Sequence, residues 1–561
     1  MTNNKLADFN VNPHHNPLRL APMVLALLAL PALAQTAPDA GQLLQQDRAA
    51  PTLPQSRPGI QIAPRANAAT LPGGAMVSLK GVRFVGNSLF SDEQLSAVLG
   101  DVAGKSYDLA GLQALAQHIS EHYRVIGYPF ARAFVPAQKF ADGVLEINIV
   151  EGRYGKVSTE GDPRLAPSAQ GFLANLAPGS VITSAALERA TLILSDQPGV
   201  LVSPLIRPGQ ETGTGDLVVT VSPAATFRGE LGLDNHGNRY TGEHRVHASL
   251  YWDSPFMLGD QITVHSNVSE ENQWLGNLGY SLPMGASGLR GNVGYAHTRY
   301  ELAKQFASLD ATGTADIVSA GLSYPLIRSQ KTNLALAGTY QQKKLIDKQG
   351  AANTRSDKTS DVVPLTLAFD HRDDLGGGGI TYGSFGYTHG TLNLDPALKA
   401  TDAVSAKSQG GFSKWNLDVA RLQATPLSQF TLFGRVSAQR ASKNLDSSED
   451  FGLGGPNGVR AYPAGEGFGD EGWLMQIEAR YQLGTLTPYA FYDAGKIKSN
   501  KTPWAAGSNH RELAGAGLGL RYNDGPWRVD ASLAWRTQGG APTADTIDRN
   551  PRVWVSAMWR F

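Results

Sequence analysis

The chain ends in Arg552-Val553-Trp554-Val555-Ser556-Ala557-Met558-Trp559-Arg560-Phe561, and this stretch decides the fold class. Successive side chains of a strand point to opposite faces, so the valines, Ala557, Trp559 and Phe561 share an apolar face. The opposite face carries an arginine near each end. A soluble core would bury both arginines, whereas a strand with lipid outside and a water-filled lumen inside leaves them in water. The stretch therefore predicts a membrane-spanning β-barrel.

Similar alternation runs through residues 226–561, with clear copies at 245–253, 262–268, 430–439 and 527–536. Spanning strands of about 9 to 11 residues, at about 20 residues per strand with its loop, fit about sixteen strands into this region. A barrel of that size encloses an aqueous lumen. A soluble all-β sandwich is the alternative for this region.

Composition narrows the possible chemistry of the chain. Its 561 residues include no cysteine, which excludes disulfides and thiolate metal sites. Its 49 basic and 49 acidic residues balance, so nothing indicates a nucleic-acid partner. No apolar run approaches the roughly 20 residues that a spanning helix requires, which excludes membrane insertion by helices.

The N-terminal residues predict export from the cytoplasm. Residues 1–34 have the order of a secretory signal peptide: Lys5 and Arg19, an apolar run over 20–33, and the small-residue exit Ala32-Leu33-Ala34. A short buried helix is the alternative. Residues 35–50 then predict a short polar helix, and residues 51–75 a proline-rich, extended linker.

Two units of similar order follow the linker. Residues 76–151 predict β-α-α-β-β, with a capping box from Ser91 to Gln94 and a second helix capped by Asp108. The expected strands cover 77–85, 130–135 and 143–150. Residues 152–225 repeat the order, with helices over 167–176 and 183–195 and strands over 200–206 and 216–221.

A glycine-rich segment at 451–472 reads Leu-Gly-Gly-Pro-Asn-Gly-Val-Arg-Ala-Tyr-Pro from Leu453 and Gly-Phe-Gly-Asp from Gly467. A second motif, Phe491-Tyr492-Asp493, follows it. The two motifs resemble those of the two-partner-secretion transporters, outer-membrane pores that export large hemolysins and adhesins. Their loop usually reads Val-Arg-Gly-Tyr or Val-Arg-Gly-Phe. Ala461 replaces that glycine here, which we expect to restrict the backbone slightly.

The resemblance implies an arrangement for nearly the whole chain. It implies a plug helix at 35–50, polypeptide-transport-associated (POTRA) domains at 76–151 and 152–225, and a transmembrane β-barrel of about 16 antiparallel strands at 226–561. The loop at 451–472 would fold into the lumen, where Arg460 would pair with Asp493. Guanidinium grips carboxylate with two parallel hydrogen bonds, which lysine cannot do. The alternative is that Arg460 and Asp493 are ordinary solvated charges.

The other candidate residues belong to the two motifs or to the first POTRA domain. The loop contributes Gly454, Gly455, Val459, Tyr462, Gly469 and Asp470, and the strand contributes Phe491. An extended substrate can add to an exposed sheet edge. Tyr128, Phe130 and Phe134 are candidates for gripping it, although some of these rings must belong to the core.

Function follows from these expectations. We expect a pore in the bacterial outer membrane, with N-terminal domains in the periplasm, that exports an unfolded secreted partner without nucleotide hydrolysis. The other expected partners are outer-membrane lipid and the insertion machinery that reads the terminal Phe561. Catalysis, cofactors, metals, nucleic acid and small-molecule substrates are not expected. Gly104-Lys105-Ser106 imitates a phosphate-binding loop, but Gly100 stands one residue short of the required spacing.

Two alternatives stay open at this point. An outer-membrane protein insertase of the same superfamily would open its barrel laterally, and such insertases usually carry more periplasmic repeats and lack the plug helix. A passive porin would have no periplasmic modules.

Overall fold

The computed structural model describes residues 37–46, 51–54, 61–62, 73–140 and 142–561. The predicted signal peptide lies outside these ranges, as do residues 47–50 of the predicted plug and most of the linker. None of the helices in the described ranges is long and apolar enough to cross a membrane.

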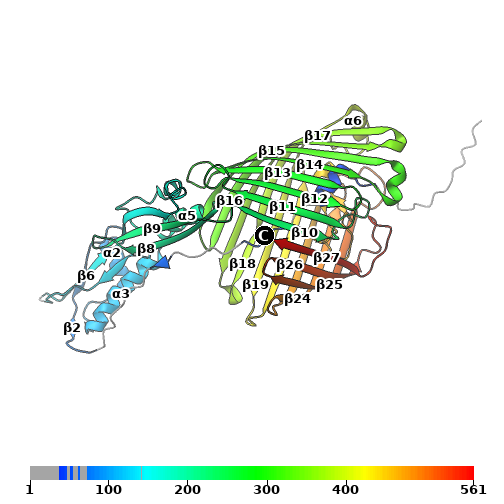
Figure 1. Cartoon of the computed structure of the whole chain (residues 1–561). Helices are drawn as coiled ribbons and strands as arrows, with labels where there is room; N and C mark the ends of the chain where they lie inside the picture. The colour runs from blue at the N-terminus through cyan, green and yellow to red at the C-terminus, as the bar shows by residue number, and fades with distance from the viewer. Residues whose placement is uncertain (1–36, 47–50, 55–60, 63–72, 141) are drawn as a thin grey trace, which may run out of the picture. The chain divides into compact units, whose positions relative to one another are not determined.

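Sixteen antiparallel strands form a closed barrel, as predicted (Figure 1). Each strand pairs with its neighbours in sequence, and the last closes against the first through Glu230↔Arg560 to Asp234↔Ser556. The strands are β10 Phe227–Asp234, β11 Arg245–Asp253, β12 Gln261–Ser269, β13 Trp274–Pro283, β14 Arg290–Glu301, β15 Ala311–Arg328, β16 Thr332–Gln349, β17 Thr354–Asp373, β18 Gly379–Leu394, β19 Gly410–Ala424, β20 Phe430–Ala441, β23 Glu471–Tyr481, β24 Leu486–Lys498, β25 His510–Asp524, β26 Trp527–Gln538 and β27 Arg552–Arg560.

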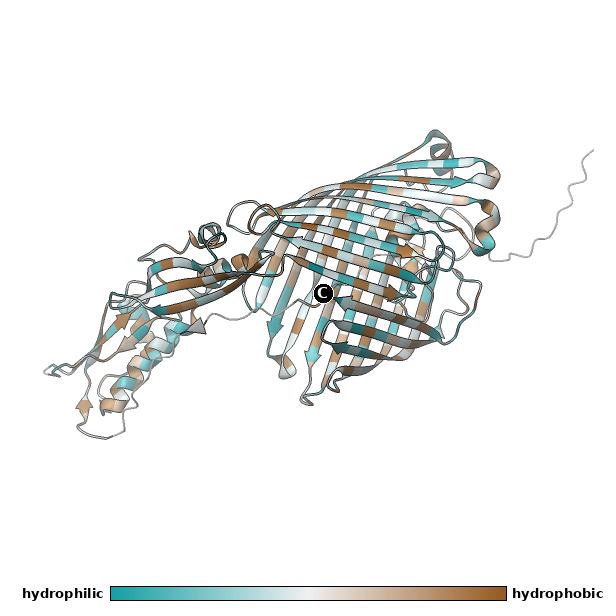
Figure 2. Cartoon of the chain, viewed as in Figure 1, coloured by the Kyte–Doolittle hydropathy of each residue, from teal (hydrophilic) through white to brown (hydrophobic). Residues whose placement is uncertain are grey.

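The faces of the last strand follow the predicted alternation. Val553 and Val555 are 47% and 43% exposed, whereas Arg552 and Trp554 are each 3% exposed. The outward residues meet solvent in the isolated chain, and in a membrane they would meet lipid. Figure 2 shows the same alternation of apolar and polar residues along the barrel strands. The lumen face is packed, because its side chains contact the loop described below.

Several strands exceed the expected 9 to 11 residues. β15 and β16 have 18 residues each, and β17 has 20. The expected length counts only the membrane crossing, and the pairing of these strands continues well beyond it. The connections between β14 and β19 contain four short helices: η2 Lys304–Leu309, η3 Gly350–Ala352, η4 Leu375–Gly377 and α6 Pro396–Ala403.

The first unit has the predicted element order with shorter strands. β3 Gly81–Val85 pairs with β6 Val144–Val150, and β6 pairs with β5 Arg132–Phe134, so β5 forms an edge. The expected first strand is split, because Val77–Ser78 (β2) pairs instead with Ser106–Tyr107 (β4). The helices α2 Asp92–Leu99 and α3 Leu109–Val125 begin at the predicted caps.

The second unit packs its helices on a sheet with the order β1-β8-β9-β7. β7 Arg153–Gly161, β8 Val200–Pro208 and β9 Thr214–Pro223 belong to the unit, and its helices are α4 Ala166–Gln170, η1 Gly171–Leu173 and α5 Ser184–Ser195. The single helix expected over 167–176 divides into α4 and η1. The fourth strand, β1 Gln61–Ile62, comes from the linker and was not expected.

Candidate functional site

The glycine-rich segment folds inside the barrel. It starts at β21 Phe451–Gly452, returns through β22 Phe468–Gly469, and its backbone closes on itself through Leu453 N to Gly467 O at 2.9 Å. Val459 and Tyr462 are completely buried. Its partners come from the neighbouring strands β20 to β27, so the segment lies inside the lumen against this part of the wall. We call residues 451–470 the lumen loop.

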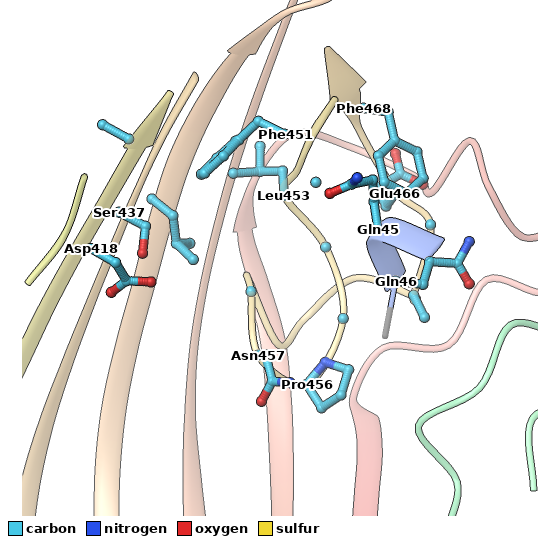
Figure 3. Close-up of a pocket in the computed structure, with 18 of the residues that line it drawn as sticks. Gln45, Gln46, Asp418, Ser437, Phe451, Leu453, Pro456, Asn457, Glu466 and Phe468 are labelled. Atoms are coloured by element: carbon cyan, nitrogen blue, oxygen red, sulfur yellow. The ribbon is translucent and has the colours of Figure 1, made fainter. Parts of the chain in front are cut away.

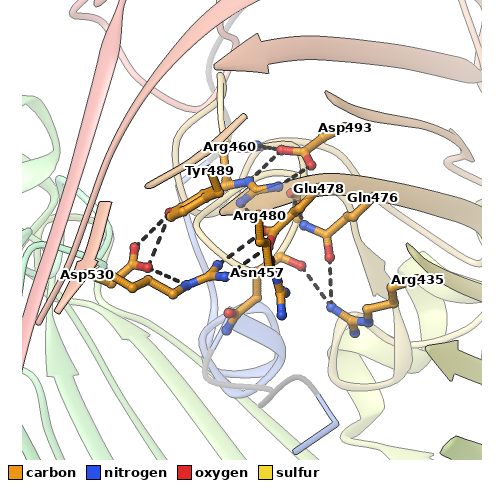
Figure 4. A network of polar contacts seen from close by, with 11 residues as sticks. Arg435, Asn457, Arg460, Gln476, Glu478, Arg480, Tyr489, Asp493 and Asp530 are labelled. Atoms are coloured by element: carbon orange, nitrogen blue, oxygen red, sulfur yellow. Dashed lines mark hydrogen bonds and ion pairs between the residues drawn. The ribbon is translucent and has the colours of Figure 1, made fainter. Parts of the chain in front are cut away.

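The structure brings Arg460 and Asp493 together (Figure 4). Nε and Nη2 of Arg460 donate to the two carboxylate oxygens of Asp493 at 2.8 and 2.7 Å, and the backbone N of Arg460 donates to the same group at 3.1 Å. The arginine is 5% exposed and Asp493 is 0% exposed. This bidentate geometry requires the planar fork of arginine.

Two further groups complete the surroundings of Arg460. Nη1 donates to Glu478 at 2.6 Å, and the guanidinium lies 3.6 Å from the ring centroid of Phe491. Glu478 also accepts from Arg480 and Arg521 at 2.8 and 3.0 Å. Glu478 was not among the site residues predicted from the sequence. A signal existed, since Gln476, Glu478 and Arg480 alternate along β23, and Glu478 is the register partner of Phe491.

A second contact holds the tip of the lumen loop. Arg435 of β20 grips Asp418 of β19 with two hydrogen bonds of 2.9 and 2.6 Å. Its Nη1 donates to the carbonyl of Asn457 at 3.2 Å, and Gln476 donates to the carbonyl of Gly458 at 2.9 Å. These contacts bind backbone atoms, so they hold the loop without depending on its side chains.

The remaining motif residues of the loop are structural. The Tyr462 hydroxyl donates to the carbonyls of Gln538 and Gly540 at 2.7 and 3.0 Å. Asp470 accepts from the backbone N of Leu445 at 2.8 Å and of Lys501 at 2.5 Å.

At two positions in the loop, the backbone and its surroundings require glycine. Gly455 has φ of +100°, which side-chain-bearing residues rarely adopt. A Cβ at Gly454 would stand 2.5 Å from the carbonyl of Pro463.

Ala461 does not restrict the loop in the way that we expected. It is absent from the residues with positive φ in the described chain, so its backbone does not use the conformation in which glycine has an advantage. Its methyl group instead faces Gly515 of β25, where a Cβ would collide with it. The small residue at 515 therefore accommodates the alanine at 461.

The helix α1 Ala40–Gln46 packs beside the lumen loop. Asp39 caps it through the backbone N of Gln42 at 2.9 Å, and Lys358 of β17 pairs with Asp39 at 3.1 Å. The backbone N of Ala40 donates to Asp347 of β16 at 2.9 Å. Leu43 is 1% exposed in a cluster with Tyr300 and other wall residues. Polar contacts at one end and apolar packing along one side hold the helix in place.

The same helix contacts the segment that leads into the lumen loop. α1 packs on η5 Ser447–Glu449, and Ser447 donates to Asp39 at 2.7 Å. Glu449 is in turn held by Lys343 and Lys414 at 2.5 and 2.9 Å. The helix and the loop therefore share one support on the barrel wall.

A small cavity lies between α1 and the lumen loop (Figure 3). Its volume is about 90 Å³, and Gln45, Gln46, Pro456 and Asn457 are among its lining residues. A volume of this order holds a small cluster of water molecules. An extended polypeptide does not fit here while the loop and helix keep these positions.

The three aromatic candidates of the first unit have different surroundings. Tyr128 packs edge-on against Phe90 and Tyr123, with ring centroids 6.1 Å apart in both cases. Phe130 packs against the core of the second unit. Phe134 is 38% exposed and lies on the edge strand β5. Only Phe134 is exposed enough to meet an added strand, so the other two rings serve the packing of the units.

A buried carboxylate joins the two units. Glu151, 4% exposed, accepts from the backbone N of Ser88 at 2.6 Å, from Leu89 N at 2.8 Å and from Arg153 at 3.4 Å. Burial opposes ionisation of Glu151. The hydrogen bonds from Ser88, Leu89 and Tyr123 outweigh burial and hold its pKa below the usual value.

In the described ranges, no three histidine, aspartate or glutamate side chains are placed to hold a metal ion.

Comparison with known proteins identifies the family. The model of the haemolysin secretion/activation proteins ShlB/FhaC/HecB matches residues 213–522, and that of the ShlB-type POTRA domain matches residues 77–152. The heme/hemopexin transporter protein HuxB of Haemophilus influenzae strain 86-028NP is 27% identical, over 84% of each chain. The hemolysin transporter protein ShlB of Serratia marcescens is 25% identical, over 90% of this chain and 87% of its own length.

Solved structures agree on the fold. CdiB from Escherichia coli superposes with a TM-score of 0.71 at 21% identity, covering 90% of this chain and 94% of that one. CdiB from Acinetobacter baumannii gives 0.62 at 18% identity, covering 88% and 91%. The barrel lies in the bacterial outer membrane, with the POTRA domain on the periplasmic side. Since the first family model covers more than half of the sequence, the chain belongs to the ShlB/FhaC/HecB family and is an outer-membrane transporter of two-partner secretion.

Proposed function

We propose that a large, unfolded partner protein passes through the lumen of this barrel after α1 and the lumen loop move aside. The observation that carries the proposal is the position of α1, which packs in the lumen against the wall and the loop. Its contacts are a few hydrogen bonds and ion pairs plus one apolar side. Such contacts are reversible, because each contributes only a small net free energy in a partly wet site.

Arg460 has a different role in this proposal. It anchors the lumen loop through Asp493, Glu478 and Phe491 at once, so the loop is held more firmly than the helix. At an effective dielectric constant of about 20, each charge pair attracts by a few kcal/mol before desolvation is subtracted. The anchor then defines the resting position to which the loop returns after each passage.

Capture of the partner begins at the first unit. β5 is an edge strand of a three-stranded sheet and carries the exposed Phe134. A strand added there gains main-chain hydrogen bonds whatever its sequence, while an aromatic ring adds apolar grip. The site suits an extended, unfolded chain rather than a folded domain.

The relatives suggest the kinds of cargo. Those matched here are named as transporters of heme/hemopexin systems and of hemolysin. Hemolysins, adhesins, contact-dependent toxins and heme-acquisition proteins are the classes we propose for this chain. Nucleic acid, small-molecule substrates and cofactors have no part in the proposal, and neither does catalysis.

Lipid and the insertion machinery are the other proposed partners. The outward residues of β27 form an apolar surface that suits lipid, and Phe561 ends the chain as an exposed aromatic residue. Folding of the exported cargo outside the cell supplies the driving force in this proposal, so no nucleotide is hydrolysed.

Single-channel conductance in liposomes tests the proposal against its rivals. Deletion of residues 38–50 should raise the conductance several-fold if α1 plugs the pore. A passive porin would conduct equally well with and without these residues, and that result would overturn the plug. A protein insertase would be recognised by accelerated insertion of other barrels into the same liposomes, with no export of a partner.

A further inference from the structure

A polar cavity lies at the outer end of the barrel closure, beside the lumen loop. β10 follows the N-terminal units in the chain, so it starts at the periplasmic end, and its connection to β11 lies at the outer end. The connection between β26 and β27 lies at that end too, because neighbouring strands are antiparallel. The cavity has a volume of about 240 Å³, and its lining includes Arg239, Glu243, Pro463, Arg549, Arg552 and Trp554.

The charges around this cavity do not balance. Arg549 pairs with Glu243 through two hydrogen bonds of 2.8 and 2.9 Å, so these two charges offset each other. Arg239 and Arg552 share the carboxylate of Asp545, which is buried and lies 3.8 and 3.1 Å from them. Within the described part of the chain, two guanidinium groups therefore pair with one carboxylate.

Both of these arginines have unused hydrogen-bond donors. Arg552 is 3% exposed on the lumen face of β27, and its Nε is buried without a hydrogen-bond partner among the described residues. The Nε of Arg239 is also buried without a partner there, because 3.8 Å to Asp545 is too long for a hydrogen bond. Asp545 already accepts from the backbone N of Ile547 at 2.9 Å. A buried donor without an acceptor is unfavourable, so these groups favour a ligand that accepts hydrogen bonds.

The surface side of the cavity contributes little to its charge. His244 lines the cavity there, and its Nδ1 lies 2.8 Å from a carboxylate oxygen of Glu270. The two side chains are 70% and 43% exposed, so water and salt screen them. The uncompensated positive charge therefore belongs to the buried side, at Arg239 and Arg552.

An oxyanion supplies both the acceptors and the missing negative charge. The planar guanidinium fork pairs with two oxygens of one phosphate or sulfate group. A water molecule accepts hydrogen bonds but leaves the buried positive charge uncompensated. Chloride compensates the charge, but a single atom does not offer two oxygens to each fork. The volume of the cavity greatly exceeds the roughly 10–15 Å³ that one water molecule needs, so a tetrahedral group has room there.

We propose that this cavity binds a phosphate-class oxyanion through Arg239 and Arg552. The anion joins the β10–β11 connection to β27, across the barrel closure. It also stabilises the resting position of the lumen loop, because Pro463 lines the cavity and Asn238 donates to the carbonyl of Ala464 at 3.2 Å. Free phosphate and the phosphate groups of lipopolysaccharide share the required chemistry. The inference does not depend on the passage of a partner protein.

Calorimetric titration of the full-length protein in detergent with inorganic phosphate tests the site. Potassium chloride keeps the ionic strength constant, because salt screens exposed charges. We expect saturable binding by the wild type, competition by sulfate, and at least tenfold weaker binding by Arg239→Gln, which changes a connection and leaves the strands intact. Arg355→Gln is the control, because Arg355 pairs with Asp357 on an exposed strand end, and it should bind like the wild type. Binding that does not saturate, or equal affinity in Arg239→Gln, would overturn the site.

Hydrogen exchange tests the effect on the lumen loop. Phosphate should slow exchange in residues 235–244 and 453–467 of the wild type and leave both segments of Arg239→Gln unchanged. Phosphate binding without slower exchange in residues 453–467 would overturn the link to the loop.

Titration in liposomes with and without lipopolysaccharide distinguishes the two sources of the anion. Loss of phosphate binding in the presence of lipopolysaccharide would support the site and assign it to the phosphates of the lipid. Unchanged binding would support the site with the free anion as its ligand. In both cases Arg239→Gln should bind at least tenfold more weakly than the wild type, and equal binding would overturn the proposal.

Discussion

The indole Nε1 of Trp554 donates a 2.7 Å hydrogen bond to the backbone carbonyl of Arg460. The last barrel strand, β27, therefore holds the main chain of Arg460, while β23 and β24 hold its side chain. Trp554 is 3% exposed and contacts His236, near the first strand, edge-on at 5.7 Å. Trp554 thus links Arg460 of the lumen loop to the closure between β10 and β27.

Trp554→Phe tests this relationship. The phenyl ring keeps the aromatic contact but leaves the carbonyl of Arg460 without this donor. A buried acceptor that loses its partner costs about 1–3 kcal/mol. We expect faster hydrogen exchange in residues 453–467, measured by mass spectrometry in detergent. Trp535→Phe on the exposed outer face is the control, and equal exchange in both variants would contradict the role of the hydrogen bond.

Arg460→Lys should behave like Arg460→Ala. Lysine keeps the positive charge but cannot form the paired hydrogen bonds to Asp493 while also reaching Glu478. We expect at least a tenfold loss of secreted partner in the medium for both variants. Arg355→Lys is the control, because Arg355 grips Asp357 in the same bidentate way on an exposed strand end. Full secretion by Arg460→Lys would show that charge alone suffices.

Gly41→Ala should expel α1 from the lumen. A Cβ at Gly41 would stand 2.5 Å from the backbone nitrogen of Ser448, where no flexible side chain can give way. We expect a several-fold increase in the open time of single channels. Gln42→Ala also adds helix propensity, but it meets no such contact in η5 and serves as the control. The prediction fails if both variants conduct like the wild type.

Acid should loosen the junction between the two units. The folded pKa of Glu151 is lowered, so its carboxylate adds stability that is complete above about pH 4.5 and is lost as the pH falls through the folded value. Glu151→Gln should abolish this part of the pH dependence while lowering stability at pH 7. Hydrogen exchange of residues 84–95, measured from pH 7 to well below pH 4, follows this loss.

Glu146→Gln provides the comparison for this titration, because Glu146 pairs with the exposed Arg83 outside the junction. It should leave the pH dependence of residues 84–95 as in the wild type. An unchanged profile in Glu151→Gln would mean that another group governs the acid response.

Much of the site was predictable because its residues carry local signals. Arg460 and Asp493 belong to motifs that resemble those of the two-partner-secretion transporters, and this resemblance implied their pairing. Glu478 was missed because the alternation of Gln476, Glu478 and Arg480 marks only one polar face of a strand, and only the register between β23 and β24 places Glu478 beside Phe491. The linker strand was missed for a similar reason, since Gln61 and Ile62 meet their partners more than 140 residues away.

The sequence by itself determined the barrel, its closing strand and the order of the two small units. Those features depend on alternation along a strand and on helix caps, which involve residues close together in the chain. Only the tertiary structure decided that Phe134, rather than Tyr128 or Phe130, is exposed, and that Asp39 meets Lys358. Burial and pairing between distant segments depend on how the elements pack, because solvent is excluded by neighbours that the local sequence does not specify.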